Sequence, residues 1–112
     1  MTEATPFEVE TYQTQDGRSP FPEWLRNLKD RVVGARIRAR LARLRLGNFG
    51  DTNTIGGGLH ELRIDHGPGY RVYFGRSGHR IVLLLCGGTK KTQARDVEQA
   101  RTYWNDYRSR TR

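Results

Sequence analysis

Cysteine, acidic residues and long apolar runs are all scarce in this sequence of 112 residues. Cys86 is the single cysteine, which excludes an intramolecular disulfide and a cysteine-based metal cluster. No apolar run reaches the length of a membrane span, and no basic and then apolar segment resembles a signal peptide. The glycine run 56–58 lacks the Gly-Lys-Ser/Thr that would complete a P-loop. We therefore expect a cytoplasmic protein with no membrane association, no cofactor and no metal ion.

Hydrophobic residues are also few, at 35% of the chain. A core built from so few apolar side chains must be thin, such as one sheet with helices packed against it. The length suits one domain and leaves no room for a second independent core. We therefore expect a single domain over residues 1–112, of a polar kind that often gains stability from a partner protein.

Acidic residues number 12 against 20 basic residues, which gives a formal net charge of +8. The basic residues are all arginine except Lys29, Lys90 and Lys91. This balance favours a polyanionic partner, because neutralised phosphates release their counterions and the planar arginine fork matches phosphate oxygens. The alternative is an arginine-rich surface without a specific partner, as the codon usage of a GC-rich genome would produce.

The hydrophobic pattern predicts an α+β fold with the element order β-α-α-β-β-β-α. Alternation with period two and short apolar runs indicate strands, whereas steps of three and four residues indicate helices. The predicted segments are a strand at 7–12, a short helix opening at Ser19-Pro20, a helix at 31–46, strands at 59–65, 70–74 and 81–86, and a helix beginning at Thr92. Residues 47–58 are predicted to form a glycine-rich loop.

Short turns join the last three predicted strands, so these strands should form an antiparallel meander. We expect an antiparallel sheet with the two N-terminal helices packed on one face, followed by the C-terminal helix. The run 81–86 is apolar throughout, which is typical of a central strand covered on both faces. The C-terminal helix or a partner protein must therefore shield the outer face of the sheet.

Alternation along the strands brings the candidate catalytic side chains to one face. If the apolar residues of strands 59–65 and 70–74 face the N-terminal helices, then Arg63, Arg71 and Tyr73 lie together on the opposite face. Lys90 follows the central strand and could reach the same surface. The alternative is that such residues form solvated cross-strand ion pairs, for example Glu61 with Arg63, and carry no function.

Cleavage of RNA by its own 2′-hydroxyl needs cations around the phosphate, a base for the hydroxyl and an acid for the leaving oxygen. Arg63 and Arg71 suit the charge-stabilising role. Tyr73 could orient the nucleotide or relay a proton, and Lys90 could act as acid or base. No residue of this group is an unambiguous general base.

The helix predicted at 31–46 carries an arginine-rich face with no acidic residue after Asp30. Two interpretations stay open: a solvated helix face, or a surface that lies along an RNA backbone. The candidate RNA-binding residues are Arg36, Arg40 and Arg43 of this helix, His66 in the turn between two strands, and Lys91 beside Lys90.

Several segments carry a resemblance to a known family. They are Glu61 to Phe74, Trp24-Leu25 with Leu28-Lys29-Asp30, Gly47 to Asp51, and Leu84 to Gly88. In order and spacing they resemble the addiction-module killer proteins, a HigB-like branch of the RelE/ParE toxins, and the similarity runs from Phe7 to Tyr107. The resemblance implies the RelE-like fold, an antiparallel sheet flanked by helices.

The same resemblance implies a toxin of a type II toxin–antitoxin system, with a helix-turn-helix antitoxin that binds it as a hetero-oligomer. It further implies a ribosome-dependent mRNA interferase, an endoribonuclease that cleaves translated mRNA. Arg63 and Arg71 match positions where such toxins place arginine, whereas Asn53 and His66 depart from the lysine and tyrosine of relatives. Two alternatives stay open: a ParE-type inhibitor that binds gyrase, and a non-catalytic module that binds nucleic acid or protein.

Overall fold

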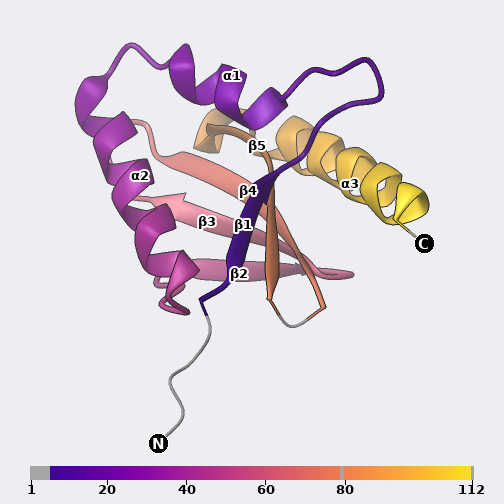
Figure 1. Cartoon of the computed structure of the whole chain (residues 1–112). Coiled ribbons are helices and arrows are strands. Elements are labelled where there is room, and N and C mark those ends of the chain that lie inside the picture. Colours follow the sequence, from indigo (N-terminus) through magenta and orange to yellow (C-terminus); the bar gives the residue numbers. More distant parts are fainter. Residues whose placement is uncertain (1–5, 79, 112) are drawn as a thin grey trace, which may run out of the picture.

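The computed structural model describes residues 6–78 and 80–111, which form an α+β fold of three α-helices and one five-stranded mixed sheet. Helices α1 and α2 cover one face of the sheet and α3 covers the other (Figure 1). The elements are β1 (Glu8–Thr11), α1 (Pro20–Arg26), α2 (Arg31–Arg45), β2 (Thr52–Gly56), β3 (Leu59–Ile64), β4 (Tyr70–Ser77), β5 (Ile81–Thr89), a 3-10 turn η1 (Lys90–Thr92) and α3 (Gln93–Arg110). None of the helices in these ranges is both long and apolar enough to cross a lipid bilayer.

The strands lie in the order β1-β5-β4-β3-β2. Strands β3, β4 and β5 form the predicted antiparallel meander, because short turns reverse the chain between them. The prediction of a fully antiparallel sheet is wrong at β1, which pairs parallel with β5. Alternation along a strand shows which side chains share a face of the sheet, but it does not show in which direction the strand runs. The direction of β1 relative to β5 depends on the long connection through α1 and α2.

Strand β2 is a second correction, because its residues fall within the segment predicted to be a loop. It pairs antiparallel with β3 at the sheet edge, with Thr54 opposite His60. Its sequence is largely polar and its side chains are exposed or half-buried, since neither face of this edge is deeply covered. Such a strand has no apolar alternation from which to predict it.

Strands β4 and β5 run past their predicted ends at residues 74 and 86, and each continues through glycine. A Cβ atom on Gly75 would lie 2.3 Å from the ring of Trp104, and one on Gly87 would lie 2.3 Å from Trp24. The two glycines therefore let a tryptophan of α3 and a tryptophan of α1 rest directly on the sheet. Close packing, and not chain reversal, requires glycine at both positions.

The core has two halves, one on each face of the sheet. On the α1/α2 face, helix α2 packs through an apolar stripe of Val33, Ile37 and Leu44, all fully buried. Leu84 of β5 joins that half, whereas its neighbour Leu83 joins the half beneath α3. The prediction that the central strand is covered on both faces is confirmed, with α3 as the outer cover.

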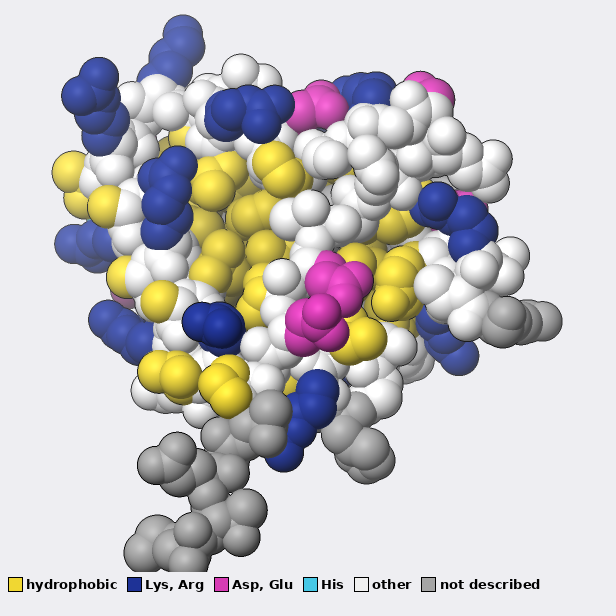
Figure 2. All heavy atoms as spheres, in the orientation of Figure 1, with side chains coloured by type: hydrophobic (Ala, Val, Ile, Leu, Met, Phe, Trp, Pro, Cys, Tyr) yellow, Lys and Arg dark blue, Asp and Glu magenta, His cyan; other side chains and the backbone are white. Residues whose placement is uncertain are grey.

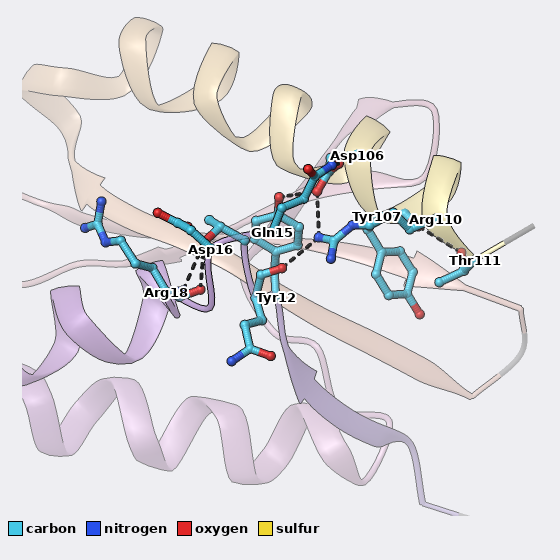
Figure 3. Close-up of polar contacts among 10 residues, drawn as sticks. Tyr12, Gln15, Asp16, Arg18, Asp106, Tyr107, Arg110 and Thr111 are labelled. Atoms are coloured by element: carbon cyan, nitrogen blue, oxygen red, sulfur yellow. Dashed lines mark hydrogen bonds and ion pairs between the residues drawn. The ribbon is translucent and has the colours of Figure 1, made fainter.

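The end of α3 is fastened to the chain that follows β1 (Figure 3). The Tyr12 hydroxyl donates a hydrogen bond to Asp106, and Arg110 donates to the same carboxylate at 2.6 Å. Arg110 also donates to the main-chain carbonyl of Gln13 at 2.7 Å. Burial and the neighbouring Asp106 raise the pKa of Tyr12 to about 12, so its hydroxyl keeps its proton as a donor.

Candidate functional site

Arg63 and Arg71 occupy directly opposite positions on β3 and β4. Tyr73 pairs with Glu61 two residues further along the same two strands, so it projects from the same face. Leu62 and Val72 project from the other face into the core beneath α1 and α2. The predicted distribution of these side chains between the two faces is therefore confirmed.

A pocket of about 350 Å³ opens where β3 ends and β4 begins. Its lining consists of Asp51, Arg63, Ile64, Asp65, Gly69, Arg71 and Lys90. Lys90 reaches it because η1 turns the chain at the end of β5, and the Lys90 N–H donates to the carbonyl of Gly69 at 2.9 Å. Three separate elements thus supply three cations to one pocket.

Arg63 is held at the pocket by an exposed ion pair. Its Nη2 and Nε atoms lie 2.9 and 3.2 Å from Oδ1 of Asp51, and its side chain is 39% exposed. Ion pairs this exposed contribute at most about 1 kcal/mol. A phosphate oxygen could therefore replace the Asp51 carboxylate at small cost.

Arg71 is held in a different way, by buried groups beneath α3. Its Nε atom lies 3.4 Å from Oε2 of Glu61, and Gln93 of α3 donates to that oxygen at 2.8 Å. Both residues are buried, with 11% of the Arg71 side chain and 5% of the Glu61 side chain exposed. Among the described residues, no hydrogen bond uses the Arg71 guanidinium, so it retains donors for a ligand in the pocket.

Glu61 is the site residue that sequence reasoning missed. An ion pair of Glu61 with Arg63 was only the alternative drawn from the sequence, whereas the structure pairs Glu61 with Arg71 and Arg63 with Asp51. The strand register carries a signal for this, because Glu61 lies diagonally across from Arg71 on the same face. The helix that buries the pair could not be placed from the sequence.

Tyr73 differs from its predicted setting, because its side chain is fully buried beneath α3. Burial, reinforced by the negative charges of Glu61 and Asp96, raises the pKa of its hydroxyl. Within the described residues that hydroxyl has no hydrogen-bond partner, and Tyr73 is absent from the pocket lining. A nucleotide in the pocket therefore cannot reach the Tyr73 side chain in this conformation, contrary to the prediction.

The arginines of α2 form a second depression, of about 360 Å³. It is lined by Arg36, Ala39, Arg40, Arg43, Ile64 and Asp65. Ile64 and Asp65 line the first pocket as well, so the two depressions adjoin at the end of β3. Six basic side chains thus border one continuous surface that runs from α2 to η1.

Arg40 is half-buried and makes hydrogen bonds within the protein, whereas its neighbours Arg36 and Arg43 are exposed. Its Nη1 donates to the carbonyl of Arg63 at 2.7 Å, and its Nη2 donates to the carbonyl of Asp51 at 3.3 Å. Burial lowers the pKa of the Arg40 guanidinium. Arg40 therefore braces the ends of β3 and the 49–51 segment, and it is less available to RNA than predicted.

Arg40→Ala is expected to lower the free energy of unfolding by about 2 kcal/mol, because it removes the side-chain donor to the carbonyl of Arg63 and one of the two donors to the carbonyl of Asp51. Arg36→Ala is the matched control on the exposed part of the same helix and should change stability by less than about 0.5 kcal/mol. Urea denaturation followed by circular dichroism measures both. Equal stability of the two variants would contradict the bracing role.

His66 and Lys91 lie outside both depressions. The Nε2 atom of His66 lies 3.1 Å from Oδ2 of Asp30, whose other oxygen accepts the N–H groups of Val32 and Val33 at the start of α2. The bond from Val33, followed by that from His66, lowers the pKa of Asp30. In the described ranges, no group of three or more His, Cys, Asp or Glu side chains could hold a metal ion.

Comparisons with known proteins give a family for this chain and a similar bacterial protein. A family profile described as "Phage derived protein Gp49-like (DUF891)" matches residues 23–106, which include the whole lining of both depressions. A protein of Haemophilus influenzae described as "Uncharacterized protein" is 49% identical over 81 residues, which is 72% of this chain and 82% of the relative. The chain therefore belongs to the Gp49-like family of phage-derived proteins.

Proposed function

We propose that this protein is the toxin of a type II toxin–antitoxin pair and that it cleaves translated mRNA on the ribosome. The observation that carries the proposal is the convergence of Arg63, Arg71 and Lys90 on one pocket. The resemblance of the 61–74 segment to HigB-like members of the RelE/ParE toxins supports it. Membership of a phage-derived family is consistent with a mobile toxin module.

In this proposal the pocket binds the phosphate at which the chain is cut. Arg63 exchanges its Asp51 contact for a phosphate oxygen, and Arg71 offers its free donors from the buried side. The phosphate gains negative charge as the 2′-oxygen attacks it. Cations already in position then stabilise that charge without reorganising.

Asp65 and Lys90 supply the proton transfers in this scheme. Asp65 is an exposed carboxylate of the lining for which the described residues provide no ion-pair partner. It takes the proton of the 2′-hydroxyl, and the 2′-oxygen forms a bond to phosphorus. The bond from phosphorus to the 5′-oxygen then breaks, and Lys90 gives that oxygen a proton. The products are a 2′,3′-cyclic phosphate and a 5′-hydroxyl.

The α2 arginines extend the same surface along the RNA backbone. Arg36 and Arg43 are exposed and border the depression that adjoins the pocket. Contacts to phosphate give affinity that falls with salt and depends little on sequence. The ribosome would then present the mRNA, and a helix-turn-helix antitoxin would neutralise the toxin by covering this surface.

Lys90→Ala is expected to reduce RNA cleavage about 100-fold, because it removes the proton donor for the leaving oxygen. Lys91→Ala is the matched comparison, since Lys91 is the next residue and lies outside the lining. The chain is expressed from a tightly repressed promoter, growth is followed, and RNA 5′ ends are sequenced. Wild type and Lys91→Ala should arrest growth with new ends inside reading frames.

Three outcomes would count against the proposal. Equal cleavage by Lys90→Ala and wild type would remove Lys90 from the site. Growth arrest with unchanged RNA ends and an induced DNA-damage response would replace RNA cleavage with inhibition of gyrase. Absence of any growth defect would leave only a non-catalytic binding module.

A further inference from the structure

Strand β1 forms an open edge of the sheet. It pairs with β5 on one side, and no described strand pairs with the other side. Glu8 and Tyr12 donate their N–H groups toward β5, to the carbonyls of Arg80 and Leu84. Because main-chain groups alternate in direction along a strand, the N–H and C=O groups of Val9 and Thr11 point outward. This edge can pair with another strand.

The open edge is acidic in a chain whose formal net charge is +8. Glu8 and Glu10 are separated by one residue, so both project from the face that α3 covers. Figure 2 shows an acidic patch over β1 with apolar side chains on both sides of it. An acidic patch repels nucleic acid, so the edge fits a different ligand from the cationic pocket.

A pocket of about 220 Å³ continues the edge on its α3 side. It is lined by Glu10, Thr11, Tyr12, Gln13, Leu83, Tyr107, Arg110 and Thr111. The positive charge of Arg110 is already paired with Asp106 (Figure 3). Among the described residues, the carboxylate of Glu10 is therefore the charge of the lining that has no ion-pair partner. A long side chain with an apolar stem and a cationic end matches this combination.

Apolar side chains border the other side of the edge. Leu46, at the end of α2, is 73% exposed, and it follows Arg45, whose carbonyl accepts the N–H of Phe7. Phe7 and Val9 are only partly buried against the core beneath α2. A strand added beside β1 would cover these apolar groups with the side chains that project from its face opposite α3.

We propose that the open edge of β1 binds an extended segment of a partner polypeptide, in which basic and apolar residues alternate, as a sixth strand. Its basic side chains would lie on the α3 side, against Glu8 and Glu10, and its apolar side chains would lie against Val9 and Leu46. A second copy of this chain is a poorer occupant, because antiparallel pairing of two β1 strands would place glutamates against glutamates. This proposal does not rest on the proposed function.

The edge is remote from the cationic pocket in the topology. Among the described strands, β1 pairs with residues 81–84 in the first half of β5, whereas Lys90 follows the other end of β5. Strands β5 and β4 also separate β1 from β3, which carries Arg63. Occupation of the edge therefore leaves the pocket open, and the two sites can be tested separately.

The probe is a fluorescein-labelled peptide of about nine residues in which lysine and valine alternate, matched to the usual length of a strand and its flanks. Fluorescence anisotropy with the full chain should show saturable binding, although both molecules are positively charged overall. Glu10→Lys should weaken binding about tenfold, because it turns an attraction into a repulsion. Glu98→Lys, on the exposed surface of α3, makes the same change of net charge and should stay within about twofold of wild type.

Hydrogen exchange locates the peptide on the chain. The amides of Val9 and Thr11 should become protected when the peptide binds, and those of Arg63 and Arg71 should not. A glutamate–valine peptide that binds equally well, or a Glu10→Lys variant with unchanged affinity, would overturn the proposal. Self-association through β1 in sedimentation velocity without peptide would overturn it in favour of a second copy.

Discussion

Gly75→Ala is expected to lower the free energy of unfolding by about 3 kcal/mol, at the upper end of the cost of overpacking a core. The new methyl group would lie 2.3 Å from the ring of Trp104, which is itself buried. Gly75 pairs with Leu59 on one side and Leu83 on the other, so the main chain cannot move away. The ring must therefore leave the sheet, and α3 must loosen with it. Chemical denaturation followed by tryptophan fluorescence measures the loss.

Gly34→Ala is the matched control for this substitution. Gly34 lies within α2, and a Cβ there would meet only the Nη1 atom of Arg38, at 3.1 Å, at the far end of a flexible side chain. Alanine favours a helix over glycine by about 1 kcal/mol, so this variant should be more stable than wild type. A Gly75→Ala variant as stable as wild type would show that Trp104 does not rest on β4.

Glu61→Ala is expected to destabilise the fold by about 3 kcal/mol, because it leaves the guanidinium of Arg71 buried without its anion. The side-chain amide of Gln93 loses its acceptor in the same variant. The double variant Glu61→Leu with Arg71→Met should recover most of the stability, since apolar side chains can replace a buried ion pair at little cost. Thermal denaturation of the single and double variants checks both expectations.

The substitutions at Glu61 and Arg71 should affect RNA cleavage and stability differently. The double variant lacks the Arg71 cation, so it should remain inactive in the RNA 5′-end assay although its fold is restored. Glu61→Gln keeps the size of the side chain and should be less damaging than Glu61→Ala in both assays. Recovery of cleavage in the double variant would contradict the role proposed for Arg71.

The candidate site shows where sequence reasoning was sufficient and where it was not. Arg63 and Arg71 could be placed on one face because strand alternation is a local property with a fixed period. Their partners could not be predicted in the same way. Asp51 reaches Arg63 from before β2, and Gln93 reaches Glu61 from α3, 32 residues further along the chain.

The solvent exposure of the site residues was harder to predict from the sequence than the face of the sheet on which they lie. Tyr73 shares a face with Arg71, but α3 covers that part of the face and leaves the end near Lys90 open. The course of α3 depends on close contacts such as those of Trp104 with Gly75, which join residues far apart in the chain. A pattern that assigns a face therefore does not say which part of that face solvent can reach.

The sequence by itself determined the helical stripe of α2, the meander of β3, β4 and β5, and the faces on which their side chains lie. Each of these follows from a periodicity within one segment or from the shortness of a turn. Only the tertiary structure decided the parallel pairing of β1, the edge strand β2, the burial of Tyr73 and the pocket that joins three cations. These features depend on contacts between segments that local periodicity does not relate.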